Sequence, residues 1–107
     1  MSHFAVIREA GSSWTEGKGT FDQVGVNDHA MFMNGLAADG FVLFAGPLAG
    51  SEHGRIRAMV IMDVADEAEI HQRLAGDPWT LSHHLDIVSI EQWNLFVGAE
   101  RLAKTVI

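Results

Sequence analysis

The chain has 107 residues, enough for one domain that buries a core without disulfide bonds. It has no cysteine and a formal net charge of −7, which argues against thiolate chemistry, Cys-based metal sites and binding to nucleic acid or an anionic membrane. The sequence shows neither a transmembrane segment nor a signal peptide, so we expect a cytoplasmic protein. We expect a single domain over residues 1–107, with a core at 3–96 and a C-terminal tail at 97–107.

Residues 3–8 contain four consecutive apolar side chains, which predict a first strand. Residues 10–27 are rich in Gly, Ser and Thr and show no sustained period, which predicts a long loop. Trp14 and Phe21 are the expected anchors of this loop. Loops of this length in a compact domain are often functional.

A helix followed at once by a buried strand is predicted at residues 28–45. Apolar side chains recur at helical spacing, with Asn27 or Asp28 as the expected N-cap. Gly40 lies where a helix commonly ends, because glycine adopts positive φ without a steric penalty. Residues 41–45 then form a continuous apolar run, which indicates a covered strand.

The second half of the chain predicts two strands with a helix between them. In residues 55–64 every second side chain is apolar, which predicts a strand with one apolar face. Residues 66–75 predict a helix that opens on a capping-box-like pair, Asp66 and Glu69. In the last strand, residues 86–96, simple alternation places Ile87 and Ile90 on opposite faces.

The resulting order, β-α-β-β-α-β, predicts an α+β ferredoxin-like fold: a four-stranded antiparallel sheet with both helices on one face. The other face of the sheet would be left bare by so short a chain. An exposed apolar sheet face commonly marks an interface, so we expect a homodimer formed through it.

This topology brings several segments to one end of the fold. They are the loop at 9–20, His29 at the start of the first helix, the Gly46-Pro47 turn, and Asp77 with Trp79 after the second helix. Asp39 falls at the opposite end, about 15 Å from His29 at 1.5 Å per helical residue. A His29–Asp39 pair is therefore excluded within one chain, whereas a His29–Asp77 pair is allowed.

Two interpretations of this pair remain open from the residues alone. A histidine near a helix N-terminus feels the positive end of the dipole, which disfavours its charged form and suits a general base. Asp77 would then orient the imidazole as a hydrogen-bond acceptor. The alternative is that His29 is an exposed helix residue and Asp77 an ordinary turn residue before a proline.

Trp14 and Trp79 would wall an apolar pocket for a ring substrate, or would serve only as core or dimer contacts. No metal site is expected. The adjacent His83 and His84, with Asp86, lack the spacing of metal ligands, and solvated turn residues are the favoured interpretation.

The chain resembles the YCII-related family of the dimeric α+β barrel group over residues 3–96. The resemblance rests on the order and spacing of four segments: HAMFMNGLAADG, FVLFAGPL, AGDPW and VSIEQWNLF. It implies a homodimer with a site built on one histidine and one aspartate, which fall on His29 and Asp77. Gly46, Pro47, Trp14 and Trp79 are the substrate-binding candidates around that pair.

Two classes of function follow. The first is a cofactor-independent lyase, isomerase or dehydrochlorinase-type enzyme that uses His29 and Asp77 on a small cyclic or aromatic metabolite. The second is a non-catalytic dimer that binds a small ligand or acts as an accessory protein. A solvent-reachable His29 beside a cavity of a few hundred cubic ångströms favours the first, and a filled end of the fold favours the second.

Overall fold

The structure, a computed structural model, describes residues 2–103. Its strands form one antiparallel sheet in the order β2-β3-β1-β4. Their bounds are Ser2–Ala10 (β1), Val42–Pro47 (β2), Arg57–Val64 (β3) and Leu85–Gln92 (β4). With a helix between β1 and β2 and between β3 and β4, this is the predicted ferredoxin-like fold.

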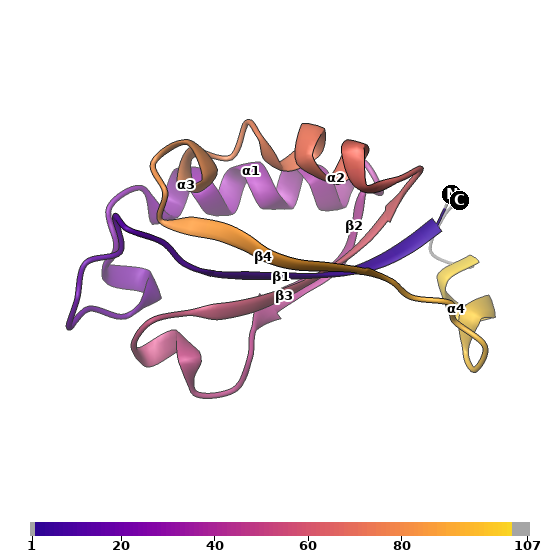
Figure 1. The fold of residues 1–107 in the computed structure, drawn as a ribbon, viewed down its shortest axis with the longest axis horizontal. Coiled ribbons are helices and arrows are strands. Elements are labelled where there is room, and N and C mark those ends of the chain that lie inside the picture. Colours follow the sequence, from indigo (N-terminus) through magenta and orange to yellow (C-terminus); the bar gives the residue numbers. More distant parts are fainter. Residues whose placement is uncertain (1, 104–107) are drawn as a thin grey trace.

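The helices of the two crossovers lie on one side of the sheet (Figure 1). They are α1 (Val26–Ala38), α2 (Glu67–Leu74) and the short α3 (Pro78–Leu81). Two 3-10 turns, η1 (Thr20–Asp22) and η2 (Ser51–His53), lie in loops, and α4 (Ala99–Ala103) follows the sheet. No helix within residues 2–103 is long and apolar enough to span a membrane.

The core lies between the sheet and these helices. The predicted inward face of β3 is confirmed, because Val60, Met62 and Val64 are each at most 2% exposed. Ile70 and Leu74 of α2 pack against that face, as their spacing predicted. Residues 104–107 of the predicted tail lie outside the described residues.

The N-cap of α2 is the predicted residue, whereas that of α1 is not. Asp66 caps α2 by accepting a hydrogen bond from the Glu69 N–H at 2.9 Å, as predicted. Helix α1 begins earlier than predicted, and its N-cap is Gly25, with φ +82° and no side-chain cap. Asn27 and Asp28 therefore lie inside the helix and do not cap it.

Strand β4 is shorter than predicted and carries an irregularity in its pairing. The register with β1 shifts between Ile7 and Arg8, so that Ile7 pairs with Ser89 and Arg8 with Ile87. The extra residue turns the strand, and Ile87 and Ile90 both pack against the core. The predicted simple alternation was therefore wrong at this point.

The long first loop is ordered by one of its two predicted anchors. Trp14 is 4% exposed, whereas Phe21 is 83% exposed and so is not a buried anchor. Gln23 is the second anchor of the loop. Its buried amide accepts from Thr15 N–H at 2.8 Å and donates to the carbonyls of Thr15 and Lys18, both at 3.0 Å.

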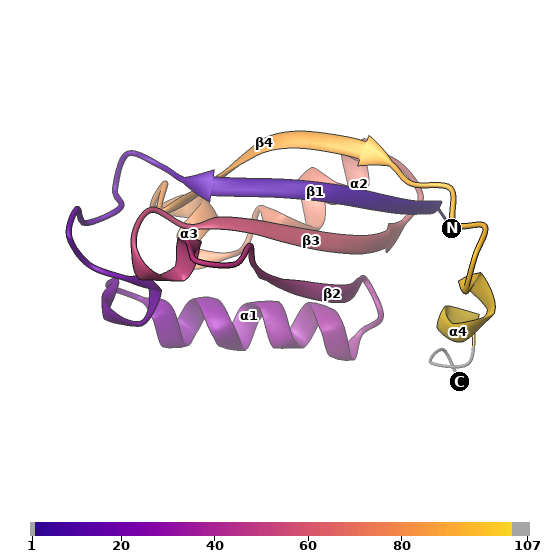
Figure 2. The same ribbon diagram turned by 90° about the horizontal axis from the view of Figure 1, so that it is seen from below.

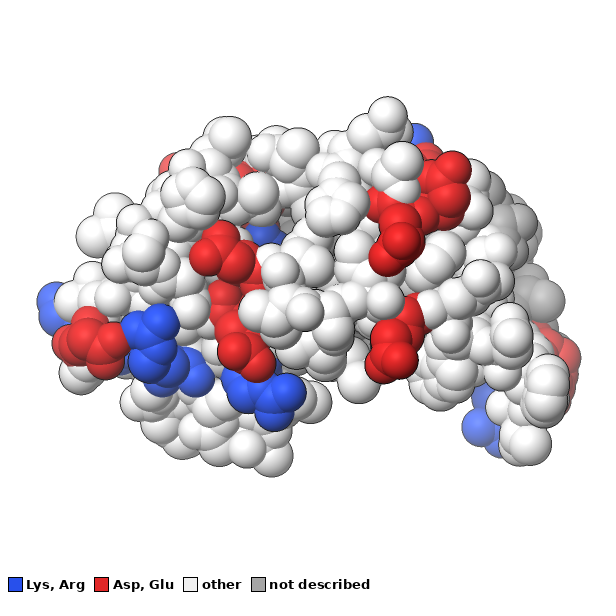
Figure 3. All heavy atoms as spheres, in the orientation of Figure 1, with Lys and Arg blue, Asp and Glu red and all other residues white. Residues whose placement is uncertain are grey.

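The face of the sheet opposite the helices is uncovered within the described residues, and Figure 2 shows β1 and β3 with no element in front of them. Phe44, Ile61 and Ala5 lie directly across from one another on adjacent strands of this face. Phe44 is 61% exposed there. In Figure 3 most of the basic side chains in view lie beside acidic ones, and they form no continuous basic surface on this face.

Candidate functional site

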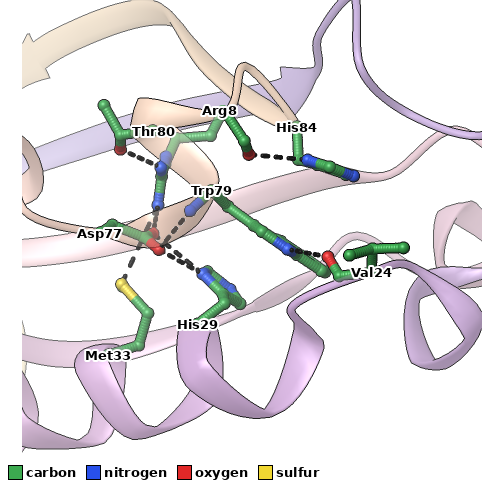
Figure 4. A network of polar contacts seen from close by, with 9 residues as sticks. Arg8, Val24, His29, Met33, Asp77, Trp79, Thr80 and His84 are labelled. Carbon is green, nitrogen blue, oxygen red and sulfur yellow. Dashed lines mark hydrogen bonds and ion pairs between the residues drawn. The ribbon is translucent and has the colours of Figure 1, made fainter.

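The candidate pair meets at the end of the fold where α1 and α3 both begin (Figure 4). His29 is the fourth residue of α1 and Asp77 is the N-cap of α3. His29 Nδ1 lies 2.9 Å from each carboxylate oxygen of Asp77, although 48 positions separate the two residues in the chain. The two helices thus bring together the side chains that the topology had allowed to meet.

Asp77 is held in place by its capping role. Its carboxylate accepts a hydrogen bond from the Trp79 N–H at 2.9 Å, and Pro78 occupies the first helical position, where its missing N–H costs nothing. The same cap points the carboxylate inward, so that the side chain is 0% exposed. A capping aspartate therefore becomes a fixed acceptor for the imidazole.

Arg8 completes this group and was missed in the sequence. Its Nη1 donates to Asp77 Oδ2 at 2.9 Å and its Nη2 donates to the Thr80 hydroxyl at 2.7 Å. The arginine is 1% exposed. The signal was present, because Arg8 continues the inward alternation of Phe4 and Val6, where a charged residue is out of place unless it has a buried partner.

Opposing effects act on the Asp77 carboxyl group. Burial raises its pKa, since it penalises the charged form. The hydrogen bonds from His29 and from the Trp79 N–H, together with the charges of His29 and Arg8, lower the pKa by more. The net pKa lies below the ordinary value, so Asp77 is a carboxylate at neutral pH.

A stack of rings backs the imidazole. The ring of Trp79 is nearly parallel to that of His29, with 10° between the planes and 4.2 Å between the centroids. Trp14 meets Trp79 edge-on, at 5.7 Å between centroids. Both tryptophans are buried and neither is among the residues that line the adjacent cavity, so in the structure they pack with His29 and do not form the cavity wall.

His29 also lines a cavity of about 430 Å³. Gly46 and Pro47, at the end of β2, form part of its wall, as the topology predicted. Most of the lining is apolar. It comes from α1, β2, β3, β4 and the residue before β3, and includes Val26, Ala30, Met33, Ala45, Ile56, Val60 and Leu85. Arg8, Thr20, Asn34 and Glu52 supply the polar groups beside His29.

A larger and more open depression, of about 630 Å³, lies at the start of α2. It contains none of the candidate side chains and is lined partly by Asp66 and Glu67. The site chemistry is concentrated in the smaller, apolar cavity. Among residues 2–103, no group of three or more His, Cys, Asp or Glu side chains is placed to hold a metal ion.

Comparison with known proteins decides the family. The model of the YCII-related domain matches residues 9–94, which is most of the chain. The protein belongs to the YCII-related family. No curated protein matches the chain.

Among solved structures, this YCII-related domain is similar to 5-chloro-2-hydroxyhydroquinone dehydrochlorinase of Burkholderia phenoliruptrix, solved in complex with 2,5-dihydroxybenzoquinone. The TM-score is 0.61 at 19% sequence identity, over 86% of this chain and 93% of the other. At this identity the likeness shows a shared fold.

The geometry of the YCII-related domain suits proton transfer at one nitrogen. Asp77 engages Nδ1 of His29, which leaves Nε2 for a ligand in the cavity. An ionised carboxylate at Nδ1 favours the tautomer that carries its proton there, so that Nε2 has a free lone pair. The His29 side chain is 17% exposed and lines the cavity, so a bound molecule can contact the imidazole.

Proposed function

We propose that this YCII-related protein is a cofactor-independent lyase or isomerase that moves a proton on a small cyclic or aromatic metabolite. One observation supports the proposal above all: His29 contacts the buried Asp77 carboxylate at 2.9 Å and at the same time lines a 430 Å³ apolar cavity. A cavity of this size holds a small ring compound. Proton transfer requires no electron carrier, so the residues of the chain suffice.

In the proposed reaction His29 Nε2 is the general base. It takes a proton from the substrate, while Nδ1–H continues to donate to Asp77 and the carboxylate stabilises the imidazolium that forms. Arg8 acts through Asp77, because its guanidinium donates to the carboxylate and its charge adds to the hydrogen bonds from His29 and the Trp79 N–H that lower the pKa of Asp77. The imidazolium then returns the proton to the substrate in an isomerisation, or releases it to water after an elimination.

A dehydrochlorinase reaction is one form of this chemistry. Loss of HCl removes one proton and one chloride, and the chloride leaves with the electron pair of the C–Cl bond. The electron pair left by the proton forms the new π bond, so neither an oxidant nor a reductant is consumed. The structural neighbour named for such a reaction makes its chlorinated ring substrate the first candidate to test on this protein.

We also propose that the protein is a homodimer that buries the uncovered sheet face. Phe44 and Met59 are 61% and 37% exposed on this face, where no element of residues 2–103 covers them. A second copy would cover an apolar surface that water otherwise contacts. The site itself lies on the helix side of the sheet, so each copy would carry its own His29 and Asp77.

The test is release of chloride from 5-chloro-2-hydroxyhydroquinone, followed with a chloride electrode, in the parent protein and in His29→Gln. Glutamine keeps a polar side chain of similar length but cannot act as a base near neutral pH. We expect the variant to lose about 10²–10⁴-fold in turnover. Equal turnover in the parent and the variant would show that His29 is not the base.

The non-catalytic class of function is separated by the same experiment. Binding of 2,5-dihydroxybenzoquinone is measured from the chemical-shift changes that it causes in the ¹H–¹⁵N signals of cavity residues. Binding without turnover of any small chlorinated or hydroxylated ring compound would favour a ligand-binding protein. Binding together with His29-dependent turnover supports the enzyme.

A further inference from the structure

Trp79 touches both members of the candidate pair without lining the cavity. Its backbone N–H donates to Asp77 Oδ1 at 2.9 Å, and its ring stacks on the imidazole of His29 at 4.2 Å between centroids. The indole is 1% exposed. A residue placed in this way cannot contact the ligand directly, but it can set the orientation of the group that does.

The indole is itself held by several contacts, and Figure 4 shows its anchor on Val24. The ring of His84 stacks on it with 16° between the planes and 5.6 Å between the centroids, and Trp14 packs edge-on. The indole Nε1–H donates to the carbonyl of Val24 at 2.9 Å. A Cβ at Gly25 would lie 3.3 Å from that nitrogen, so a glycine at this position leaves room for the approach.

The carboxylate alone does not fix the imidazole plane. Both oxygens of Asp77 lie 2.9 Å from Nδ1, so the ring can pivot about this contact without losing it. The terminal torsion of histidine is broad and has no steep staggered minima of its own. A parallel aromatic surface at van der Waals distance removes this freedom, because rotating the imidazole would drive its edge into the indole.

We propose that Trp79 is a positioning residue: its indole face fixes the plane of the His29 imidazole, so that Nδ1 stays on Asp77 and Nε2 is directed into the cavity. This rests on the proposed function for its consequence in turnover, but the positioning itself is a property of the free protein. Anchoring to Val24, next to the start of α1, ties the indole to the helix that carries His29.

The test uses ¹⁵N NMR of the imidazole nitrogens of His29, assigned by loss of their signals in His29→Gln. In the parent protein we expect the tautomer with the proton on Nδ1 to dominate. Trp79→Leu removes the flat surface and should give a mixture of tautomers with broadened signals. Trp79→Phe lacks the donor to Val24 but keeps an aromatic face. Because the face is retained, this variant should keep the parent tautomer.

Leu74→Ala is the matched control. Leu74 is 1% exposed and belongs to a different part of the core, so its truncation weakens the fold without touching the ring stack. We expect this variant to keep the tautomer signals of the parent. If Trp79→Leu does not fold, Trp79→Met replaces it, because methionine fills more of the space but is not planar.

With 5-chloro-2-hydroxyhydroquinone as substrate, we expect Trp79→Leu to lower kcat at least tenfold and to leave KM within twofold. Trp79→Phe should stay within threefold of the parent in kcat. Unchanged imidazole signals in folded Trp79→Leu or Trp79→Met would overturn the proposal, as would an equal change in Leu74→Ala. If no variant turns over the substrate but the signals behave as expected, the positioning stands and the proposed function fails.

Discussion

Arg8 and Asp77 form an ion pair inside the protein, with Arg8 Nη1 2.9 Å from Asp77 Oδ2. The side chains are 1% and 0% exposed, so water contacts neither charge. Each charge is stabilised by the other and by neutral hydrogen-bond partners, Thr80 for the arginine and the Trp79 N–H for the carboxylate. The pair is thus a structural element of the fold as well as the support of His29.

This burial changes the expected cost of losing Asp77. As a turn residue it would contribute on the order of 1 kcal/mol at most. Removing one partner of a buried ion pair leaves an uncompensated charge and costs about 3–5 kcal/mol. We therefore expect Asp77→Ala to lower the free energy of unfolding by that larger amount, measured by urea denaturation.

Asp66→Ala is the control for this prediction. Asp66 also caps a helix through its carboxylate, but it is exposed, and no buried cation of residues 2–103 pairs with it. Its loss should cost about 1 kcal/mol, the usual effect of removing a cap. Equal costs for the two variants would show that the Arg8–Asp77 pair adds nothing to stability beyond the cap.

The stability of the protein should depend on the ionisation of Asp77. Burial raises the pKa of Asp77. The hydrogen bonds from His29 and the Trp79 N–H and the charges of His29 and Arg8 lower it by more, so the pKa is lower in the folded protein than in the unfolded chain. At a pH between the folded and the unfolded pKa of Asp77, the unfolded chain binds more protons than the folded protein, so stability rises with pH. The contribution is complete above about pH 4, the ordinary range of an aspartate, and is lost as the pH falls through the folded value.

Urea midpoints measured from pH 7 to pH 2 in the parent protein and in Asp77→Asn test this dependence. Asparagine keeps the size of the side chain but does not titrate. We expect the parent to lose its advantage over the variant below about pH 4. A difference that stays constant down to pH 2 would contradict a lowered Asp77 pKa.

Filling the cavity should block ligand binding without unfolding the protein. Ala30 lies on α1, is exposed and lines the cavity. We expect Ala30→Phe to weaken binding of 2,5-dihydroxybenzoquinone at least tenfold, as measured by titration calorimetry. Ala38→Phe, at an exposed position of the same helix away from the cavity, should bind like the parent, and equal loss in both would place the ligand elsewhere.

The oligomeric state should depend on the uncovered sheet face. We expect light scattering to give about twice the 11.7 kDa of one chain. Met59→Glu places a charge on that face and should yield monomers, because burying an unpaired carboxylate is costly. Met31→Glu, at a more exposed methionine of α1, should remain dimeric, and a monomeric parent protein would refute the dimer.

The sequence by itself determined much of the fold, because local patterns of a few residues predict its helices and strands. The alternation at 55–64, the cap at Asp66 and the glycine stop at Gly40 each act over a few residues, and the structure confirms all three. From their order the β-α-β-β-α-β topology follows, and with it the convergence of His29 and Asp77 at one end.

Only the tertiary structure decided how the site is built. Arg8 was predicted only as the end of a strand and Phe21 as a loop anchor, and Trp79 was left open between a pocket wall and a core or dimer contact. Their roles depend on contacts between residues up to 72 positions apart, such as Arg8 with Thr80, which no local pattern encodes. Burial of a charge is determined by what packs over it, and that becomes fixed only when α1 and α3 close on the sheet.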